Sequence, residues 1–78
     1  MVHAAFILIQ TSPGKAWIIA EKISKIDGVK IAYPVTGPYD IIAYVESKEE
    51  IAQLLKEIIA RIHSIKGVRR TLTAIVMH

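Results

Sequence analysis

Hydrophobic positions divide this chain into four short apolar runs of strand length and two longer segments with the period of a helix. We predict strands over residues 4–10, 29–35, 39–46 and 68–77, because these runs are rich in Ile, Val, Tyr and Ala and are bounded by turn residues. A first helix is predicted after residue 12 and a second after residue 47. Their apolar faces consist of Ala16, Ile19, Ala20, Ile23 and Ile26, and of Ile51, Leu54, Leu55, Ile58, Ile59, Ile62 and Ile65.

Capping residues give the expected ends of these helices. Ser12 followed by Pro13 predicts an N-cap hydroxyl and a proline in the first helical position. Ser47 and Glu50 have the spacing of a capping box for the second helix. Gly28 and Gly67 each follow a predicted helix and precede a valine, so both helices are expected to end in the same manner.

The resulting order, βαββαβ, is that of a split βαβ repeat. Right-handed crossovers in such a chain give a four-stranded antiparallel sheet of strand order 4-1-3-2 with both helices on one face, the ferredoxin-like α+β fold. In that order the second and fourth strands are edges. Pro34 in the second and Arg69 and Arg70 in the fourth suit edges, whereas the first and third strands are apolar on both faces.

The uncovered face of this sheet predicts self-association. Helices cover one face only, so the other face of the central strands needs a second cover, and we expect a homodimer packed sheet against sheet as in a dimeric α/β barrel. The predicted interface residues are Phe6, Leu8, Ile42 and Tyr44. Trp17 and Ile18 point away from the apolar stripe of the first helix, and two interpretations stay open: a contact that joins dimers into larger rings, or ordinary exposed side chains.

Composition narrows the class of protein. The chain has 78 residues, which is one domain, and no apolar run approaches the roughly 18 residues of a membrane span. It has no cysteine, which excludes disulfides and thiolate chemistry, and nothing at its start resembles a secretory signal, so we expect a cytoplasmic protein. The absence of Asn and the abundance of Ile suggest a thermophile.

The net charge of +3 does not by itself predict nucleic-acid binding. The basic residues are scattered along the chain, and only Lys66, Arg69 and Arg70 are grouped. Basic residues at the start of an edge strand are ordinary protection of that edge, so we favour a solvated surface over a DNA-binding one.

The segment 35–40, Val-Thr-Gly-Pro-Tyr-Asp, is the strongest candidate site in the sequence. Gly37 permits a positive φ and Pro38 fixes the next one, so a tight turn is expected between two strands. Asp40 then opens an apolar strand, where a carboxylate requires a partner. Two interpretations stay open from the residues alone: Asp40 caps its own turn, or it binds a ligand or a neighbouring subunit.

Candidate catalytic residues are few. His3, His63 and His78 lie at a strand entry, on the polar side of the second helix and at the last position, with no spacing typical of metal ligands or of a base and its partner. The chain has no phosphate-binding glycine loop and no nucleophile elbow. We therefore expect a protein that is not an enzyme and that uses no metal or cofactor.

Four segments taken in order resemble one known family. They are residues 12–15 (Ser-Pro-Gly-Lys), 26–29 (Ile-Asp-Gly-Val), 35–42 (Val-Thr-Gly-Pro-Tyr-Asp-Ile-Ile) and 65–76 (Ile-Lys-Gly-Val-Arg-Arg-Thr-Leu-Thr-Ala-Ile-Val). Together they are similar to the effector domain of Lrp/AsnC transcriptional regulators, the domain of regulation of amino-acid metabolism. Those regulators carry an N-terminal helix-turn-helix domain, and here the first strand follows Met1 directly. The resemblance therefore implies a stand-alone form of the domain over residues 1–78, without direct DNA contact.

The resemblance also implies a ligand and a site. Domains of this kind bind small amino acids between dimers, with a Gly-x-x-Asp turn from one subunit and the end of the last strand from another. Gly37, Pro38, Tyr39 and Asp40 match the turn, and Thr71 and Thr73 lie on the last strand. The implied assembly is a ring of dimers, from a tetramer to an octamer or decamer.

For the ligand, the carboxylate of Asp40 suits an ammonium, and backbone N–H groups or threonine hydroxyls suit a carboxylate. For the two threonines the residues alone favour another explanation, because threonine suits an exposed strand face whatever the function; the family resemblance shifts them toward binding. Two other functions stay open: an assembly module that forms mixed oligomers with full-length regulators, and a dimeric α+β barrel enzyme such as a monooxygenase or isomerase.

Overall fold

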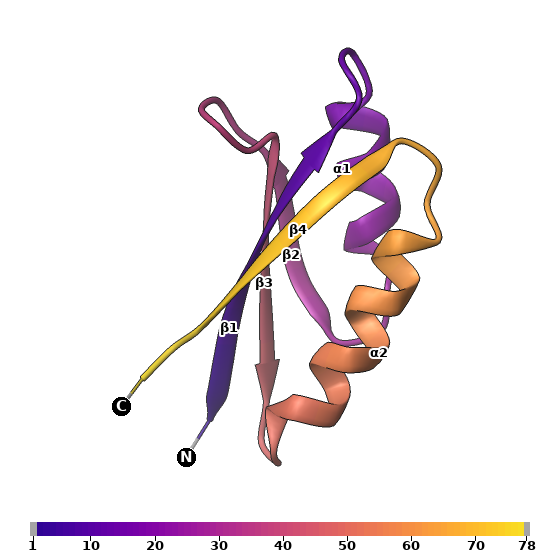
Figure 1. Cartoon of the computed structure of the whole chain (residues 1–78). Coiled ribbons are helices and arrows are strands. Elements are labelled where there is room, and N and C mark those ends of the chain that lie inside the picture. Colours follow the sequence, from indigo (N-terminus) through magenta and orange to yellow (C-terminus); the bar gives the residue numbers. More distant parts are fainter. Residues whose placement is uncertain (1, 78) are drawn as a thin grey trace.

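The computed structural model describes residues 2–77 and has the six expected elements in the expected order (Figure 1). They are β1 (His3–Thr11), α1 (Ala16–Ser24), β2 (Val29–Pro34), β3 (Ile41–Ser47), α2 (Ile51–His63) and β4 (Val68–Ile75). The predicted strands differ from these by one or two residues at most ends, a usual uncertainty at element boundaries.

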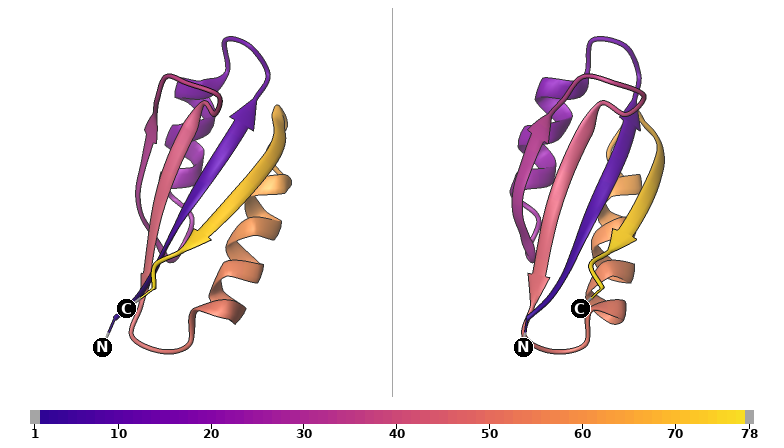
Figure 2. Two further views of the ribbon diagram at one scale, coloured as in Figure 1. Left: turned by 60° about the vertical axis from the view of Figure 1, so that its left-hand side comes forward. Right: turned by 90° about the vertical axis from the view of Figure 1, so that its left-hand side faces the viewer.

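The sheet confirms the predicted topology. Its strand order is β2-β3-β1-β4, and every neighbouring pair is antiparallel. Both helices lie on one side of it, with α1 and α2 side by side behind the strands (Figure 2). Pro34 and the arginines Arg69 and Arg70 are on the two edge strands, as expected.

The hydrophobic core lies between the helices and one face of the sheet. The strands contribute Ala5, Ile7, Ile9, Ile41, Ala43 and Val45, and the helices contribute Ile19, Ala20, Ile23, Ile51, Leu55, Ile58 and Ile62. All of these are buried, and full burial of an isoleucine side chain stabilises a fold by about 1.5–3 kcal/mol. The apolar helical faces predicted from the sequence are therefore confirmed.

The predicted helix starts were wrong at both helices. Helix α1 begins at Ala16, and no side chain caps it. Residues 12–15 instead form a tight turn, in which the Lys15 N–H donates to the Ser12 carbonyl at 3.2 Å and Gly14 takes a φ of +77°. Proline followed by glycine with positive φ is the preference of a type II turn, and this turn prevents Ser12 from reaching the helix.

At α2 the capping box is absent for a similar reason. The Ser47 hydroxyl accepts a hydrogen bond from the Glu49 N–H at 3.2 Å, and Ser47 itself is the last residue of β3. A hydroxyl that bonds the backbone two residues further on forms a local turn in place of a helix cap.

The two helix exits are equivalent, as predicted. Gly28 and Gly67 have φ values of +96° and +103°. The valine after each glycine donates its N–H to an isoleucine carbonyl three residues earlier, Val29 to Ile26 at 3.0 Å and Val68 to Ile65 at 3.3 Å. A β-carbon at Gly67 would lie 2.9 Å from Cδ1 of the buried Ile19, so this exit is closely packed on α1.

We expect Gly67→Ala to lower the free energy of unfolding by about 2–3 kcal/mol, because it combines a positive φ with a contact on Ile19. Gly14→Ala is the matched control. It also has a positive φ but nothing within 4 Å of the added carbon, so the loss should be about 1 kcal/mol. Urea unfolding at one fixed protein concentration measures both; equal losses would contradict the packing argument.

Candidate functional site

The turn at residues 35–40 projects from one end of the sheet, beyond the strands that it connects (Figure 1). The Val35 N–H donates to the Asp40 carbonyl at 2.8 Å and closes the turn. Gly37 has a φ of +119°, and the space around its α-carbon is open. The sequence therefore predicted the turn and the reason for its glycine correctly.

The carboxylate of Asp40 has a partner within the chain. Its Oδ2 accepts the backbone N–H of Thr11 at 2.8 Å, and the Asp40 N–H donates to the Ile9 carbonyl at 2.9 Å. This partner lies on β1, and neither of the two interpretations drawn from the sequence included it. Asp40 holds the start of β3 against the end of β1, and it does so at the point where the β1–β4 pairing shifts register between Gln10 and Thr11.

Several hydrogen-bonding groups of the turn remain available. The Oδ1 atom of Asp40 makes no protein hydrogen bond within residues 2–77, and neither do the N–H groups of Thr36, Gly37 and Tyr39. The side-chain amide of Gln10 donates to the Pro38 carbonyl at 3.4 Å. The turn thus presents one carboxylate oxygen and several N–H donors on a backbone that β1 holds in place.

Thr71 and Thr73 lie on the opposite side of β1 from this turn. Ile9 of β1 pairs with Ile41 on one side and with Thr71 on the other, and Ile7 pairs with Thr73. Both threonines share the helix-covered face, where Thr71 Oγ1 is 3.2 Å from Nε2 of His63. Within one chain, the structure therefore does not bring the two halves of the expected site together.

Three residues of this region were not predicted from the sequence: Gln10, Thr11 and His63. Gln10 and Thr11 contact the turn from 28 and 29 residues away along the chain, and His63 contacts Thr71 from eight residues away. Neither Gln10 nor His63 belongs to a recognisable motif. Only the register of β1 against its neighbours could have identified Gln10 and Thr11 as neighbours of the turn.

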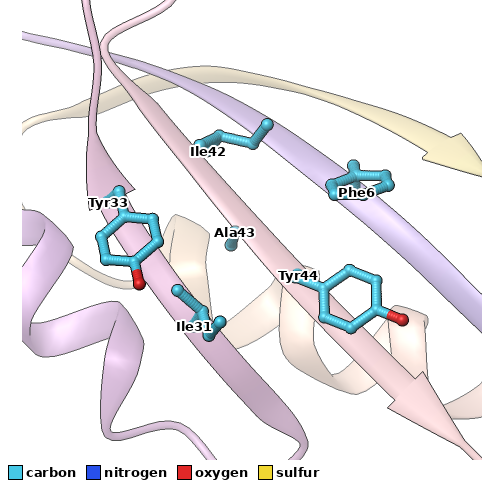
Figure 3. Close-up of a pocket in the computed structure, with 6 residues that line it drawn as sticks. All are labelled: Phe6, Ile31, Tyr33, Ile42, Ala43 and Tyr44. Atoms are coloured by element: carbon cyan, nitrogen blue, oxygen red, sulfur yellow. The ribbon is translucent and has the colours of Figure 1, made fainter.

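The helix-free face of the sheet, which we call the open face, carries a patch of large apolar side chains. Phe6, Ile31, Tyr33, Ile42, Ala43 and Tyr44 line a hollow of 330 Å³ over β1, β2 and β3 (Figure 3). Phe6 and Tyr44 pack with ring centres 5.1 Å apart. Leu8 and Leu72 extend the open face across β1 to β4, where Leu72 is 51% exposed.

A polar pair lies at one end of this face. The Tyr44 hydroxyl donates to Oε2 of Glu46 at 2.9 Å. This hydrogen bond, then partial burial and the negative charge of Glu46, raise the pKa of the Tyr44 phenol. Tyr44 therefore stays neutral above its ordinary range, and the stability that the pair contributes is lost only as the pH rises from the ordinary tyrosine pKa through the raised one.

Trp17 and Ile18 are exposed, at 79% and 59%. Their predicted orientation away from the core stripe is therefore confirmed. Whether they contact another subunit remains a prediction.

Within residues 2–77 no three His, Asp or Glu side chains are grouped closely enough to hold a metal ion. His3 and His63 lie apart on β1 and α2, and His78 is outside the described residues. In the same part of the chain, no helix is both long and apolar enough to cross a membrane.

The fold and the turn together define a class: a split βαβ domain with one open apolar face and a glycine-containing turn at one end of its sheet. The model of the Lrp/AsnC ligand binding domain matches residues 4–78. The chain therefore belongs to the family of Lrp/AsnC effector-binding domains, as the four sequence segments suggested.

Solved structures agree with this assignment. TTHA0845 from Thermus thermophilus is 33% identical with a TM-score of 0.87, and the match covers 100% of this chain and 95% of that one. E. coli AsnC is 30% identical with a TM-score of 0.81, over 97% of this chain and 51% of AsnC.

An enzyme is also among the relatives. Homocitrate synthase from Saccharolobus islandicus is 39% identical over 59 residues. The match covers 76% of this chain, and the chain spans only 12% of the length of that relative.

We expect Asp40→Ala to lower the free energy of unfolding by about 1–3 kcal/mol, because it leaves the partly buried Thr11 N–H without its charged acceptor. Asp40→Asn keeps an acceptor oxygen and should cost less. Denaturant unfolding of both variants tests this, with Asp27→Ala as an exposed control expected to change stability by less than about 0.5 kcal/mol. A loss no greater than that of the control would show that the Thr11 contact contributes nothing.

Proposed function

We propose that this domain binds a free α-amino acid and self-associates, and that it acts in the regulation of amino-acid metabolism without contacting DNA itself. The observation that carries the proposal is the turn at residues 35–40, in a chain that belongs to the Lrp/AsnC ligand-binding family. This turn combines a carboxylate oxygen with N–H donors that have no protein acceptor within residues 2–77.

The chemistry of the turn suits an α-amino acid. Oδ1 of Asp40 is a hydrogen-bond acceptor for an ammonium, and the charge of the carboxylate strengthens that bond. The N–H groups of Gly37 and Tyr39 can donate to a carboxylate, and the absence of a side chain at Gly37 lets a ligand approach the backbone closely. Oδ2 stays engaged with Thr11, so Asp40 is held in position before a ligand arrives.

In this proposal the hydroxyls of Thr71 and Thr73 come from a neighbouring subunit. Their position across β1 from the turn supports this, because one chain cannot use both groups on one small ligand. The ligand site is then complete only in an assembly.

The open face supports a homodimer as the unit of that assembly. Its large apolar side chains include Phe6, Leu8, Ile42 and Tyr44, and a second copy of the same face would bury them. Trp17 and Ile18 then remain available for contacts between dimers in a larger ring. Both helices of the described chain pack on the sheet, which leaves neither free to enter a DNA groove.

The amino-acid proposal predicts a thermal shift. A ligand that binds only the native state stabilises it by about 2.7 kcal/mol at a hundred times its Kd, so at least one of the standard amino acids should raise the Tm. Calorimetry on that amino acid should give binding for the natural chain and for Asp27→Asn, with loss of binding in Asp40→Asn and in Thr71→Val. If none of the standard amino acids shifts the Tm, the proposal is wrong.

The dimer proposal predicts that a charge on the open face separates the subunits. Leu72 and Ile75 lie on the same strand with similar exposure, 51% and 55%, but on opposite faces of the sheet. We expect the natural chain and Ile75→Glu to have the mass of at least two chains by light scattering at micromolar concentration, and Leu72→Glu to have the mass of one. A monomeric natural chain would contradict the proposal.

A second candidate function follows from the homocitrate synthase match. A segment of homocitrate synthase is similar to this domain. In this second proposal the partner that the chain regulates is an enzyme, in place of a DNA-binding regulator. The two functions differ in one measurement. With effector present, an enzyme partner changes its turnover when this chain is added, whereas a regulator partner changes its affinity for DNA.

A further inference from the structure

We infer that Glu46 and Arg70 set the register of the homodimer, with Glu46 of each copy facing Arg70 of the partner subunit across the open face. The inference rests on the proposed sheet-to-sheet dimer. It adds a specific pair of contacts that decides how the two apolar faces are placed on each other.

Both charged residues belong to the open face. In the β1–β3 ladder Phe6 is opposite Tyr44 and Ala4 is opposite Glu46, so Glu46 lies one step beyond the apolar patch on the same side as Tyr44. In the β1–β4 ladder Leu8 is opposite Leu72 and Gln10 is opposite Arg70. Arg70 therefore lies one step beyond the patch at its other end.

Glu46 and Arg70 lie at equal distances from the centre of β1, in opposite directions along the strand and on opposite sides of it. Ala4 and Gln10 are equally distant along β1 from Ile7, and β3 and β4 flank β1 on opposite sides. Glu46 and Arg70 thus lie at opposite corners of the patch, roughly 22 Å apart for strands about 4.8 Å apart with a rise of about 3.4 Å per residue. Consider a second copy related to the first by a two-fold axis that lies between the two sheets, passes over Ile7 and is perpendicular to the line from Glu46 to Arg70. This axis places the Glu46 position of one copy opposite the Arg70 position of the other.

The resulting isologous dimer contains the same contact twice. Glu46 of one subunit faces Arg70 of the partner subunit, and Arg70 of the first faces Glu46 of the partner subunit. It also places the apolar rows between them on each other. Slid or turned arrangements would bury similar apolar area but leave the charges unmatched or place like charges together, which costs free energy. Apolar contact supplies affinity, and the two corners select one arrangement.

Neither charge is neutralised by an opposite charge in its own chain. Within residues 2–77 the ion pair present is Lys25 with Glu21, on the exposed side of α1. Arg70 is exposed, and the side chain opposite it, Gln10, donates to the Pro38 carbonyl. Glu46 accepts the Tyr44 hydroxyl, which holds its carboxylate on the open face.

Two lysines lie near Glu46 and are the competing partners. Lys30 and Lys48 line a small hollow of 120 Å³ together with Glu46, without forming an ion pair with it. If these lysines satisfied Glu46, reversing its charge would not affect association, and the experiment below separates the two cases.

The test uses charge reversal and mixing. A Glu46→Arg homodimer would place two arginines opposite each other at each corner, and an Arg70→Glu homodimer would place two glutamates there. Because like charges repel, each variant alone should dimerise at least about tenfold more weakly than the natural chain. In an equimolar mixture both corners are complementary again. We expect the mixture to form a heterodimer with an affinity close to that of the natural chain, measured by analytical ultracentrifugation or by fluorescence transfer between labelled chains.

The controls separate a register effect from other effects. Glu49→Arg, in the segment after β3, and Arg69→Glu, next to Arg70 on β4, make the same charge changes outside the proposed pair and should dimerise as the natural chain does. The milder Glu46→Gln and Arg70→Gln should each weaken the dimer by a few fold. Thermal unfolding identifies any variant that fails to fold, and mixing would not rescue such a variant.

The outcomes are distinct. A dimeric natural chain whose charge variants associate normally, or whose mixture is no tighter than the single variants, overturns the Glu46–Arg70 pair and leaves the proposed dimer intact. A monomeric natural chain overturns both. Rescue on mixing that weakens at 1 M salt, where the screening length falls to about 3 Å, supports the ion pair.

Discussion

The two ladders that β1 makes with β3 and β4 are the constraint on which the rest of this structure depends. They place Ile7 and Ile9 under the helices, they fix which residues of β3 and β4 share the open face, and they bring the end of β1 to the turn at residues 35–40. Because side chains alternate along a strand, a shift of one residue in either ladder would exchange the buried and open faces of a strand. Burial of the core side chains therefore sets the register of the strands, and this register in turn fixes which residues of β1 lie beside the turn.

Local and distant interactions explain which parts of the fold were predictable. The strand order, the helical faces and the equivalent exits at Gly28 and Gly67 follow from apolar period and from glycine, which act over a few residues. The helix starts were wrong because the hydroxyls of Ser12 and Ser47 each lie before a short turn, and a turn of two or three residues competes with a cap over the same distance. Serine at such a position fits both outcomes, and only the positive φ of Gly14 separates them at α1.

The candidate site was predictable in its residues but not in its connections. The turn and the unusual position of Asp40 are visible in the sequence, since a carboxylate at the start of an apolar strand is uncommon. Its partner, Thr11, is distant along the chain and becomes a neighbour only through the β1–β3 pairing. The contact between His63 and Thr71 likewise depends on how α2 returns to β4, which no local pattern specifies.

Asp40 illustrates how a structural and a binding role can belong to one side chain. A carboxylate has two oxygens and can accept several hydrogen bonds, so the bond from Thr11 to Oδ2 leaves Oδ1 available. That bond also joins the turn to β1, and the other edge of β1 pairs with β4, where Thr71 lies opposite Ile9. An effector that used the turn of one subunit and the threonines of another would therefore bind only where two subunits meet. By linkage, its binding and their association would strengthen each other by the same factor, which is a physical route from the concentration of an amino acid to the state of an assembly.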